Sequence, residues 1–475
     1  MKILLVSPCQ PEEVRPKSMD IPQLTLSLIA GMTPPEHEVE ICEEVYGNKI
    51  NFDGDYDLIG ITLMTQTCIR GYQIANEFKQ REKIVVFGGI HATTYPEEAI
   101  QFGDAVVIGE AEDGLWEQVL RDAEKNKLRE YYKLDQLPLL QKHVYPRRDL
   151  IKCSSGKFAI APIETTRGCP YNCDFCTVSR FFGTKQRHKP IRDIIKEAES
   201  CKEKILFFLD DNITIDKKFA KELFRELKPL NKKWVGQASI NLTKDEELMS
   251  LAEKSGCTAL LVGFESMTDT GIDAYRKSLK SIEENVAAVK KLREYGILTM
   301  ASLIFGLDSD TDTVFDLGHE FLTKSKAAFF QACVMTPYPG TPVFNTLKSE
   351  GRILTDNWSK FDATKVLIQP KNMTSEELLE GYNKIKYSIY SRRSTLRRSI
   401  PNIRLGVKEA IFYFSLNYGY HKKNNKKVHS QIHRNEENMP VDFDVKKYVA
   451  PFKKKDGENT KKFHFQNLTT TQDIK

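Results

Sequence analysis

Long apolar runs are missing from this sequence, and none reaches the ~18–20 consecutive residues that a membrane-spanning helix needs. The first apolar stretch, residues 3–6, stops at Ser7-Pro8 and is too short for the core of a signal peptide. Most of the chain also lacks a charge excess, since residues 1–420 hold 57 basic and 58 acidic residues. With 475 residues, 40% hydrophobic and 28% charged, the composition excludes a wholly disordered protein. We therefore expect a folded, cytoplasmic protein whose thiols stay reduced.

Basic residues are concentrated at the C-terminal end of the chain. Residues 421–475 contain 13 Lys and Arg against 7 Asp and Glu, a charge of +6. Large aliphatic residues are few there, so the sequence predicts a basic, mobile tail. Its charge suits peripheral contact with an anionic membrane surface. Nucleic-acid binding is not expected, because lysine runs such as Lys453-Lys454-Lys455 are usually solvated.

Short apolar runs alternate with helical patterns over residues 1–125. The runs that read as buried strands are 3–6, 39–41, 58–63, 84–87 and 105–108. This alternation is typical of a parallel sheet covered by helices on both faces. Small or polar residues follow several of these strands, and such sheets bind ligands at the carboxyl ends of their strands. The sequence therefore predicts a ligand site at that edge.

A second alternating series follows a predicted connector, residues 126–157, which shows no sustained periodicity. Its strand candidates are 158–163, 205–209, 234–239, 259–264, 300–305 and 329–335. Six βα units over residues 158–345 predict a partial barrel, short of the eight units of a full one. Residues 346–420 are predicted to form a mixed, mainly helical C-terminal region.

Three of the ten cysteines lie close together in Gly168-Cys169-Pro170-Tyr171-Asn172-Cys173-Asp174-Phe175-Cys176. They follow the first strand of the second series, and three thiolates in so tight a loop favour an iron–sulfur cluster. No fourth cysteine lies nearby, so one iron would stay open, as catalytic metal sites require. Zinc is the alternative, and it would need His188 as a nearby fourth ligand.

The Cys-x3-Cys-x2-Cys motif, with an aromatic residue before its last cysteine, resembles the signature of radical SAM enzymes. The resemblance implies a [4Fe–4S] cluster on Cys169, Cys173 and Cys176, with S-adenosylmethionine chelating the fourth iron. It also implies that electron transfer to the sulfonium yields a 5′-deoxyadenosyl radical.

Further motifs resemble the radical SAM subgroup that carries an N-terminal cobalamin-binding domain. They include Gly263-Phe264-Glu265-Ser266 in the barrel and Gly88-Gly89-Ile90-His91 in the first domain. The implied fold class is α/β, with a Rossmann-like cobalamin-binding parallel sheet, a partial (β/α)6 radical SAM barrel and a helical C-terminal region. The residues implied to bind cobalamin are Thr62, Met64, Thr65, Gly88, Gly89, His91, Gly109 and Glu110.

One departure from the cobalamin pattern bears on the mechanism. Domains that ligate cobalt through histidine carry Asp-x-His-x-x-Gly, and this chain has no such string. His91 stands in His-Ala-Thr-Thr instead. The chain therefore resembles domains that hold cobalamin without a histidine on cobalt, and a domain that has lost cobalamin is the alternative.

Polar residues at or near the barrel strand ends are candidates for binding S-adenosylmethionine. They are Asp210, Asp211, Asn212, Gln237, Ser239 and Glu265, and the backbone of Phe175 is expected to contact the adenine. For each of the polar residues the alternative is a structural role in helix capping or barrel hydrogen bonding.

The resemblance implies an enzyme that methylates an unactivated carbon with methylcobalamin. A cyclase, oxidase or rearrangement enzyme with the same parts is the nearest alternative, and an iron–sulfur sensor that binds nucleic acid through its tail is the alternative from another class. The expected partners are a small-molecule or lipid-like substrate and an electron donor such as flavodoxin or ferredoxin.

Overall fold

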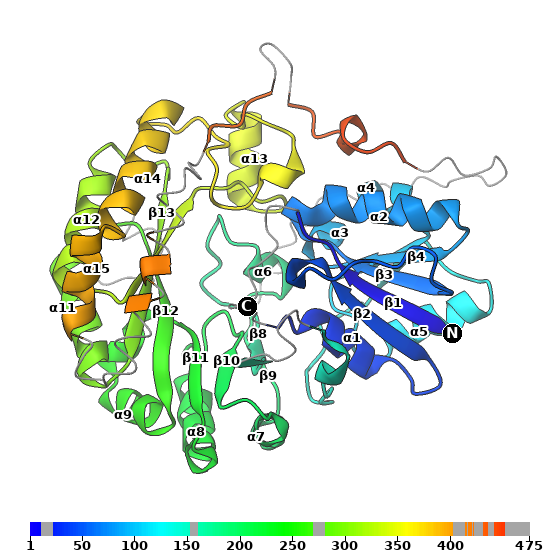
Figure 1. Ribbon diagram of the computed structural model, residues 1–475, viewed down its shortest axis with the longest axis horizontal. Coiled ribbons are helices and arrows are strands. Elements are labelled where there is room, and N and C mark those ends of the chain that lie inside the picture. Colours follow the sequence, from blue (N-terminus) through cyan, green and yellow to red (C-terminus); the bar gives the residue numbers. More distant parts are fainter. Residues whose placement is uncertain are drawn as a thin grey trace, which may run out of the picture.

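The computed structural model describes residues 1–10, 22–152, 160–268, 281–401, 414–415, 417–419, 421, 431–435 and 441–451. Within these residues two parallel sheets of six strands each lie side by side, with a short hairpin between them (Figure 1). No helix of this part of the chain is long and apolar enough to cross a membrane.

The N-terminal sheet has the strand order β2-β1-β3-β4-β5-β6. Its strands are β1 (Lys2–Ser7), β2 (Glu38–Glu43), β3 (Leu58–Thr62), β4 (Ile84–Gly88), β5 (Ala105–Ile108) and β6 (Tyr131–Lys133). Its helices are α1 (Thr25–Met32), α2 (Cys68–Gln80), α3 (Ile90–Thr94), α4 (Pro96–Ala99) and α5 (Leu115–Glu124). Alternation along β1 sends Ile3 and Leu5 toward α1 and α5, and Leu4 and Val6 toward α2, so both faces of the sheet are buried.

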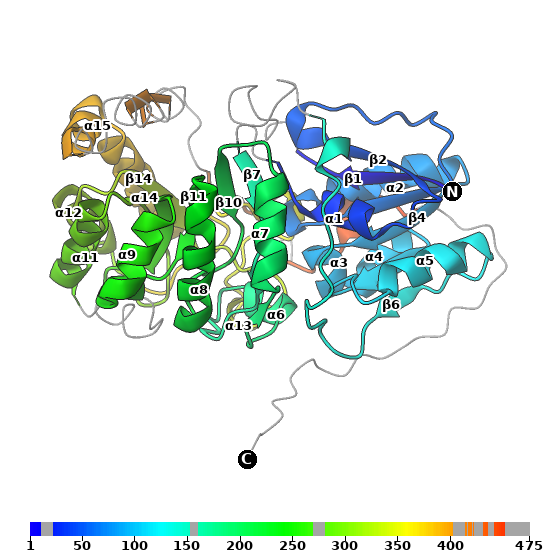
Figure 2. The ribbon, with the colours of Figure 1, turned by 90° about the horizontal axis from the view of Figure 1, so that it is seen from below.

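The second sheet has the order β14-β13-β12-β11-β10-β7. Its strands are β7 (Ile160–Ile163), β10 (Ile205–Phe208), β11 (Lys233–Ala238), β12 (Cys257–Glu265), β13 (Leu298–Phe305) and β14 (Phe329–Val334). The helices along its outer face are α7 (Ile191–Ser200), α8 (Lys217–Leu227), α9 (Glu246–Lys254), α11 (Ile282–Glu294), α12 (Val314–Ser325) and α14 (Ser375–Ile389) (Figure 2). This confirms the predicted partial barrel.

Local sequence explains where several of these helices begin and which face they bury. Asp216 caps α8 by accepting from the backbone N–H of Lys218 and Phe219. Thr374 and Glu377 form a reciprocal capping box at the start of α14. The buried residues of α8 recur every three or four positions, as on a helix with one apolar face: Ala220, Leu223, Phe224 and Leu227.

The remaining elements lie between the two sheets or, as α15 does, on the outside of the barrel (Figure 1). They are the antiparallel hairpin β8 (Thr166–Arg167) and β9 (Arg187–His188), then α6 (Val178–Phe181), α13 (Pro342–Ser349) and α15 (Arg392–Ser399). The 3₁₀ turns are Glu44–Tyr46, Thr65–Thr67, Ile100–Phe102, Arg148–Leu150, Lys228–Leu230, Ile240–Lys244, Trp358–Lys360 and Val445–Lys447. Trp358 donates from Nε1 to Glu98 (3.3 Å) and packs in the same apolar core as α2. The C-terminal region thus stabilises the first sheet as well as the barrel.

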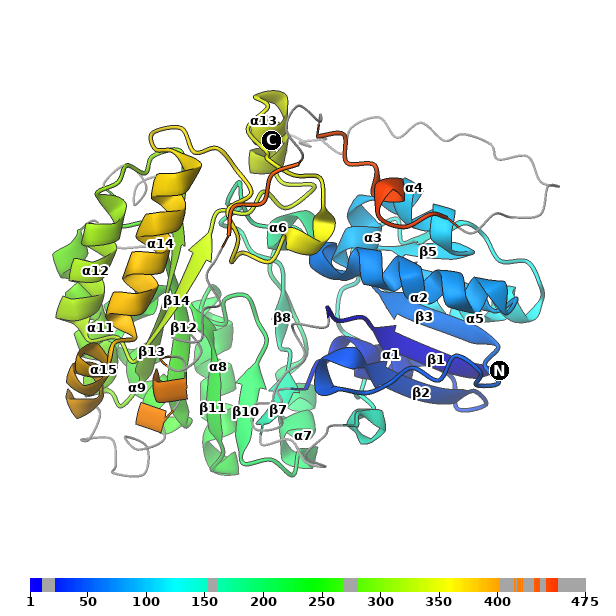
Figure 3. The same cartoon turned by 45° about the horizontal axis from the view of Figure 1, so that its top comes forward.

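Two predictions need correction. Residues 126–157, predicted as a connector only, contribute β6 to the first sheet, because Val106, Val107 and Ile108 pair with Tyr131–Lys133. The predicted mobile tail is wrong for residues 441–451, which run along the first domain near α2 and α4 (Figure 3). Val445 and Val449 of this segment are buried in the same core as α2. Both segments owe their order to contacts with residues far away in the sequence, which local composition does not reveal. Most of the rest of the tail lies outside the described residues.

Candidate active site

The three clustered cysteines lie in the loop that the hairpin β8–β9 closes. Cys169 and Cys173 are buried, and Cys176 is partly exposed. The loop folds back on itself, since the backbone N–H of Cys169 donates to the carbonyl of Gly183 (3.2 Å). Gly168 has φ +92°, and a Cβ there would lie 2.4 Å from the carbonyl oxygen of Lys185. Only glycine fits this close approach, which sets the direction in which the cysteines leave the hairpin.

A buried ionic network joins this hairpin to the N-terminal sheet. Arg167 NH1 lies 2.5 Å from Glu110 Oε2 and 2.6 Å from Glu112 Oε1, and its Nε lies 2.9 Å from Glu164. Arg187 NH2 pairs with the other oxygen of Glu110 (2.5 Å), and Lys189 pairs with Glu164 (2.9 Å). Three carboxylates thus face three cations.

This network shifts the pKa values of two of its members, Glu164 and Arg167. Burial alone would raise the pKa of Glu164, but Arg167 and Lys189 outweigh it and hold that pKa at about 2. The pKa of Arg167 is raised well above its usual value, because three carboxylates outweigh the effect of its burial. Glu164 and Arg167 therefore stay charged throughout the neutral pH range.

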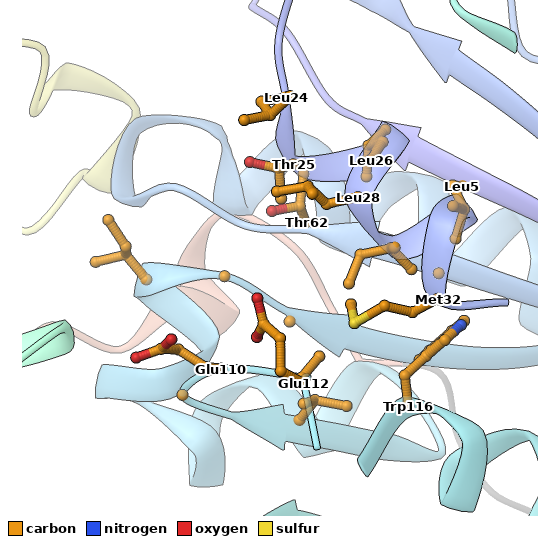
Figure 4. Close-up of a pocket in the computed structure, with 18 of the residues that line it drawn as sticks. Leu5, Leu24, Thr25, Leu26, Leu28, Met32, Thr62, Glu110, Glu112 and Trp116 are labelled. Atoms are coloured by element: carbon orange, nitrogen blue, oxygen red, sulfur yellow. The ribbon is translucent and has the colours of Figure 1, made fainter. Parts of the chain in front are cut away.

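A cleft of about 350 Å³ lies between the two sheets, at the carboxyl ends of β3, β4 and β5. One wall comes from the first domain and the other from the cysteine hairpin, including Arg167 and Phe182. Figure 4 shows Glu110 and Glu112 on one side of the cleft, Leu24 and the α1 residue Leu28 across from them, and Trp116 at one end. Six of the eight residues predicted to bind cobalamin line this cleft: Thr62, Met64, Gly88, Gly89, Gly109 and Glu110.

The other two residues of that set, Thr65 and His91, do not line the cleft. His91 is fully buried, and its Nε2 lies 2.9 Å from Glu98 Oε1. Glu98 also accepts from the hydroxyl of Tyr72 (2.9 Å) and from Trp358. His91 is thus part of a buried polar network that attaches the C-terminal region to the first domain.

The floor of the cleft fits a flat macrocycle. A Cβ on Gly88 or Gly109 would meet nothing within 4 Å, so two glycines leave open space above the sheet edge. Gly89 has φ +94°, and a Cβ there would lie 2.8 Å from both Leu63 O and Thr62 Oγ1. These residues fit cobalamin on the floor of the cleft, and the three thiols fit the three-ligand iron–sulfur cluster.

The candidates for S-adenosylmethionine divide into two groups. Asp210 is buried and accepts from Thr165 Oγ1 and Thr166 Oγ1, both at 2.6 Å. Burial raises the pKa of Asp210, while these hydrogen bonds act to lower it. Asn212 Oδ1 accepts from Thr214 Oγ1 (2.9 Å) and from the backbone N–H of Ser239 (3.2 Å). Asp210 and Asn212 therefore brace the strands beside the cysteine loop.

The second group lies at the carboxyl ends of β10, β11 and β12. Asp211 follows β10, Gln237 and Ser239 lie at the end of β11, and Glu265 ends β12 with φ +63°. The carboxylate of Glu265 folds over Gly263, where a Cβ would lie 2.5 Å from Oε1. Phe175 lies in the cysteine loop and is partly buried against the first domain. These residues share the barrel end that carries the cysteines.

The alternative zinc site is not supported by the position of His188. Its Nε2 lies 3.6 Å from Asp216, and its ring packs 4.3 Å from that of Phe219, so it contacts α8 and the turn before it. Five of the scattered cysteines in the described residues are buried and Cys333 is partly exposed; loss of solvent raises the pKa of Cys42 to about 12 and that of Cys333 to about 11. Cys153 lies outside the described residues.

The ionic network is the part of the site that the sequence did not predict. Glu112, Glu164, Arg187 and Lys189 gave no local signal, although Arg167 stands directly before the cysteine motif. One feature could have indicated the network. Arg187 lies opposite Arg167 in the hairpin, so two basic residues face the same side of the first domain.

Comparisons with known proteins agree with this geometry. The family profile described as Radical SAM superfamily matches residues 163–317, and the B12 binding domain profile matches residues 21–117. Bacteriochlorophyllide d C-8(2)-methyltransferase of Chlorobaculum tepidum is 32% identical over 400 residues, covering 80% of this chain and 88% of that protein. The C-12(1)-methyltransferase of the same organism is 29% identical over 386 residues, covering 79% and 84%.

A solved structure with a similar fold is TsrM of Kitasatospora setae, a radical S-adenosylmethionine methyltransferase with cobalamin and a [4Fe-4S] cluster bound. It superposes with a TM-score of 0.64, covering 90% of this chain and 99% of TsrM, at 14% identity. At that identity the likeness concerns the fold.

Proposed function

Because the chain belongs to the radical SAM superfamily and carries a B12-binding domain ahead of its barrel, we propose that it is a cobalamin-dependent methyltransferase acting on an unactivated carbon of a small molecule. The observation that carries this proposal is the cleft. Residues of the B12-binding domain and of the cysteine hairpin line the same space, so both cofactors can act on one substrate.

When bound, a [4Fe–4S] cluster supplies the electron that cleaves S-adenosylmethionine, and cobalamin supplies a transferable methyl group. Cys169, Cys173 and Cys176 would hold the cluster, and the two buried cysteines limit access of water to it. The ionic network around Arg167 holds the cysteine hairpin against the first domain, which fixes the two cofactor sites relative to one another.

We assign S-adenosylmethionine to the barrel end that carries the cysteines. Phe175, Asp211, Gln237, Ser239 and Glu265 are the residues that would contact it. Asp210 and Asn212 are assigned a supporting role, because their side-chain oxygens already accept hydrogen bonds from threonines of the protein.

We assign cobalamin to the floor formed by Gly88, Gly89 and Gly109, with Thr62, Met64 and Glu110 around it. His91 is excluded from the cobalt, because its ring is buried against Glu98. His91 would therefore serve to hold the first domain to the C-terminal region and would not supply a ligand to bound cobalamin.

The proposal is tested by anaerobic reconstitution with cobalamin and S-adenosylmethionine that carries a deuterated methyl group. Because two relatives are named for methylating bacteriochlorophyllide d, that tetrapyrrole is the first substrate to offer, followed by a metabolite extract. Mass spectrometry should find a product that has gained the labelled methyl group. A variant with Cys169, Cys173 and Cys176 all replaced by Ala should give none. Cleavage of S-adenosylmethionine without methyl transfer would favour the cyclase or oxidase alternative.

An electron donor is needed to start each turnover, and we propose a flavodoxin or a ferredoxin. Since reduction of the cluster needs one electron at a time, a one-electron carrier is the fitting class of partner.

We also propose peripheral contact with an anionic membrane, through α15 and the neighbouring turn of helix. Leu396, Ile400 and Phe414 are 54%, 56% and 40% exposed. Arg398 and Asn417 both donate to Ala328 O, which places the two segments side by side. The exposed arginines Arg392, Arg393 and Arg397 surround this apolar surface. Flotation with phosphatidylglycerol vesicles should recover the protein, and L396D/I400D should abolish recovery.

A further inference from the structure

The segment after β6 covers the outside of the cysteine hairpin. Arg187 NH1 donates to the carbonyl of Pro138 (2.6 Å), and Gln141 Nε2 lies 3.4 Å from the carbonyl oxygen of His188. A Cβ on Gly183 would come within 2.8 Å of Leu137 Cδ1. Residues 137–141 are therefore in contact with the backbone that follows the cysteines.

This surface exposes aliphatic side chains to solvent. Leu139 is 72% exposed, more than any other large apolar side chain of the described residues, and Leu137 is 42% exposed. Their neighbours Pro138 and Leu140 are buried, so the backbone position of the exposed pair is fixed. Exposed apolar side chains on a well-anchored segment are characteristic of the centre of an interface.

Basic residues lie close to the two leucines along the chain: Lys142 follows Leu139 by three positions, and Arg180 and Lys185 flank Gly183, which borders Leu137. Lys142, Arg180 and Lys185 are exposed, and none of them forms an ion pair with another described residue. Within residues 135–142 and 180–186 the sequence contains one acidic residue, Asp135. The surface is thus apolar at its centre and basic around it.

The same surface is close to the first cysteine. The carbonyl of Gly183 accepts from the N–H of Cys169 (3.2 Å), and the carbonyl of Lys185 borders the position of a Gly168 Cβ. A single layer of backbone therefore separates the basic residues from the cysteine loop. A protein that binds here would reach the cluster over a short path.

We propose that Leu137, Leu139, Lys142, Arg180 and Lys185 form a donor-docking surface for an acidic one-electron carrier protein. The inference rests on the proposed function, because only a reaction started by reduction needs such a carrier. One electron leaves the reduced carrier and enters the cluster, so the carrier is oxidised and the cluster is reduced by one electron. No bond is formed or broken and no proton is exchanged. Interfaces of this kind are small, and opposite charges steer their encounter.

The test compares binding with reduction in the full-length, reconstituted protein. An acidic flavodoxin is the probe, and its affinity is measured by calorimetry at two salt concentrations. The charge reversal R180E/K185E should weaken binding at least about tenfold and remove its salt dependence. L139S should also weaken binding, and this exposed position should not affect folding. The matched control is R121E/K125E, which makes the same charge change at the exposed end of α5, away from this surface.

A second readout separates this inference from the proposed function. Dithionite reaches the cluster without docking, so the surface variants should cleave S-adenosylmethionine at the wild-type rate with dithionite and more slowly with reduced flavodoxin. Equal flavodoxin affinity in wild type and R180E/K185E would overturn the docking surface. Failure of wild-type protein to cleave S-adenosylmethionine with dithionite would count against the proposed function. The binding measurements would still show whether flavodoxin docks on this surface.

Discussion

At the scale of single residues, Asp310 should make the stability of the protein depend on pH. It is fully buried after β13, where its Oδ2 accepts from the backbone N–H of Gly306 and Leu307, both at 3.0 Å. Burial raises its pKa to about 7, against the lowering effect of these hydrogen bonds. Between about pH 4 and pH 7, the Asp310 carboxyl is therefore protonated in the folded protein and ionised in the unfolded chain. Stability from this group is present at low pH and declines as the pH rises toward 7.

We therefore expect Asp310→Asn to remove this pH dependence. From pH 5.5 to 7.5, the free energy of unfolding of wild type should fall by about 2 kcal/mol relative to the variant. Urea unfolding at the two pH values measures this difference. Asp55→Asn, at a fully exposed side chain, is the control and should follow wild type. A difference between wild type and Asp310→Asn that stays constant with pH would contradict the assignment.

Substitutions at two adjacent glycines should distinguish an effect on folding from an effect on cofactor binding. Gly89→Ala places a Cβ 2.8 Å from Leu63 O at φ +94° and should cost about 1–3 kcal/mol of stability. Gly88→Ala meets nothing within 4 Å and should leave the melting temperature unchanged, but its methyl group fills the floor of the cleft. We expect Gly88→Ala to weaken cobalamin binding, measured by absorbance titration. If Gly88→Ala bound cobalamin like wild type, cobalamin would not lie on this floor.

At the scale of elements, the sequence was sufficient to predict a strand wherever that strand is itself a run of apolar residues. The apolar runs of β1, β3 and β13 were predicted within one or two residues. The hairpin β8–β9 was not, because strands of two residues have no periodicity. The same holds for the contact of Arg167 with Glu110, which joins residues 57 positions apart.

The ionic network should make this hairpin sensitive to the loss of one carboxylate. Glu110→Ala leaves Arg167 and Arg187 buried without their shared partner, and we expect a loss of about 3–5 kcal/mol. Glu320→Ala removes an exposed i,i+4 pair with Lys324 and should have no measurable effect. Thermal unfolding compares the two variants. Equal melting temperatures would show that the network does not hold the hairpin in place.

At the scale of the whole molecule, one apolar core joins parts that the sequence presents as separate. Residues of α2, the segment around Trp358 and residues 441–451 pack together, although about 370 residues separate their ends. Composition could not predict this, because the tail has few aliphatics and each gains its burial only against the folded body. Charge alone therefore gave the wrong boundary for the tail.

Residues 441–451 determine where the chain can be shortened without loss of stability. Val445 and Val449 are buried, and Tyr448 donates to Asp356 Oδ1 (2.5 Å), a carboxylate that is itself buried. A chain that ends at Pro440 loses these contacts and leaves Asp356 without its tyrosine partner. Burial of two valines contributes about 3 kcal/mol or more, so the melting temperature should fall by several degrees. A chain that ends at Pro451 keeps them and should melt like the full chain. If the chain ending at Pro440 were equally stable, residues 441–451 would be dispensable, and the tail would begin before them as composition alone predicts.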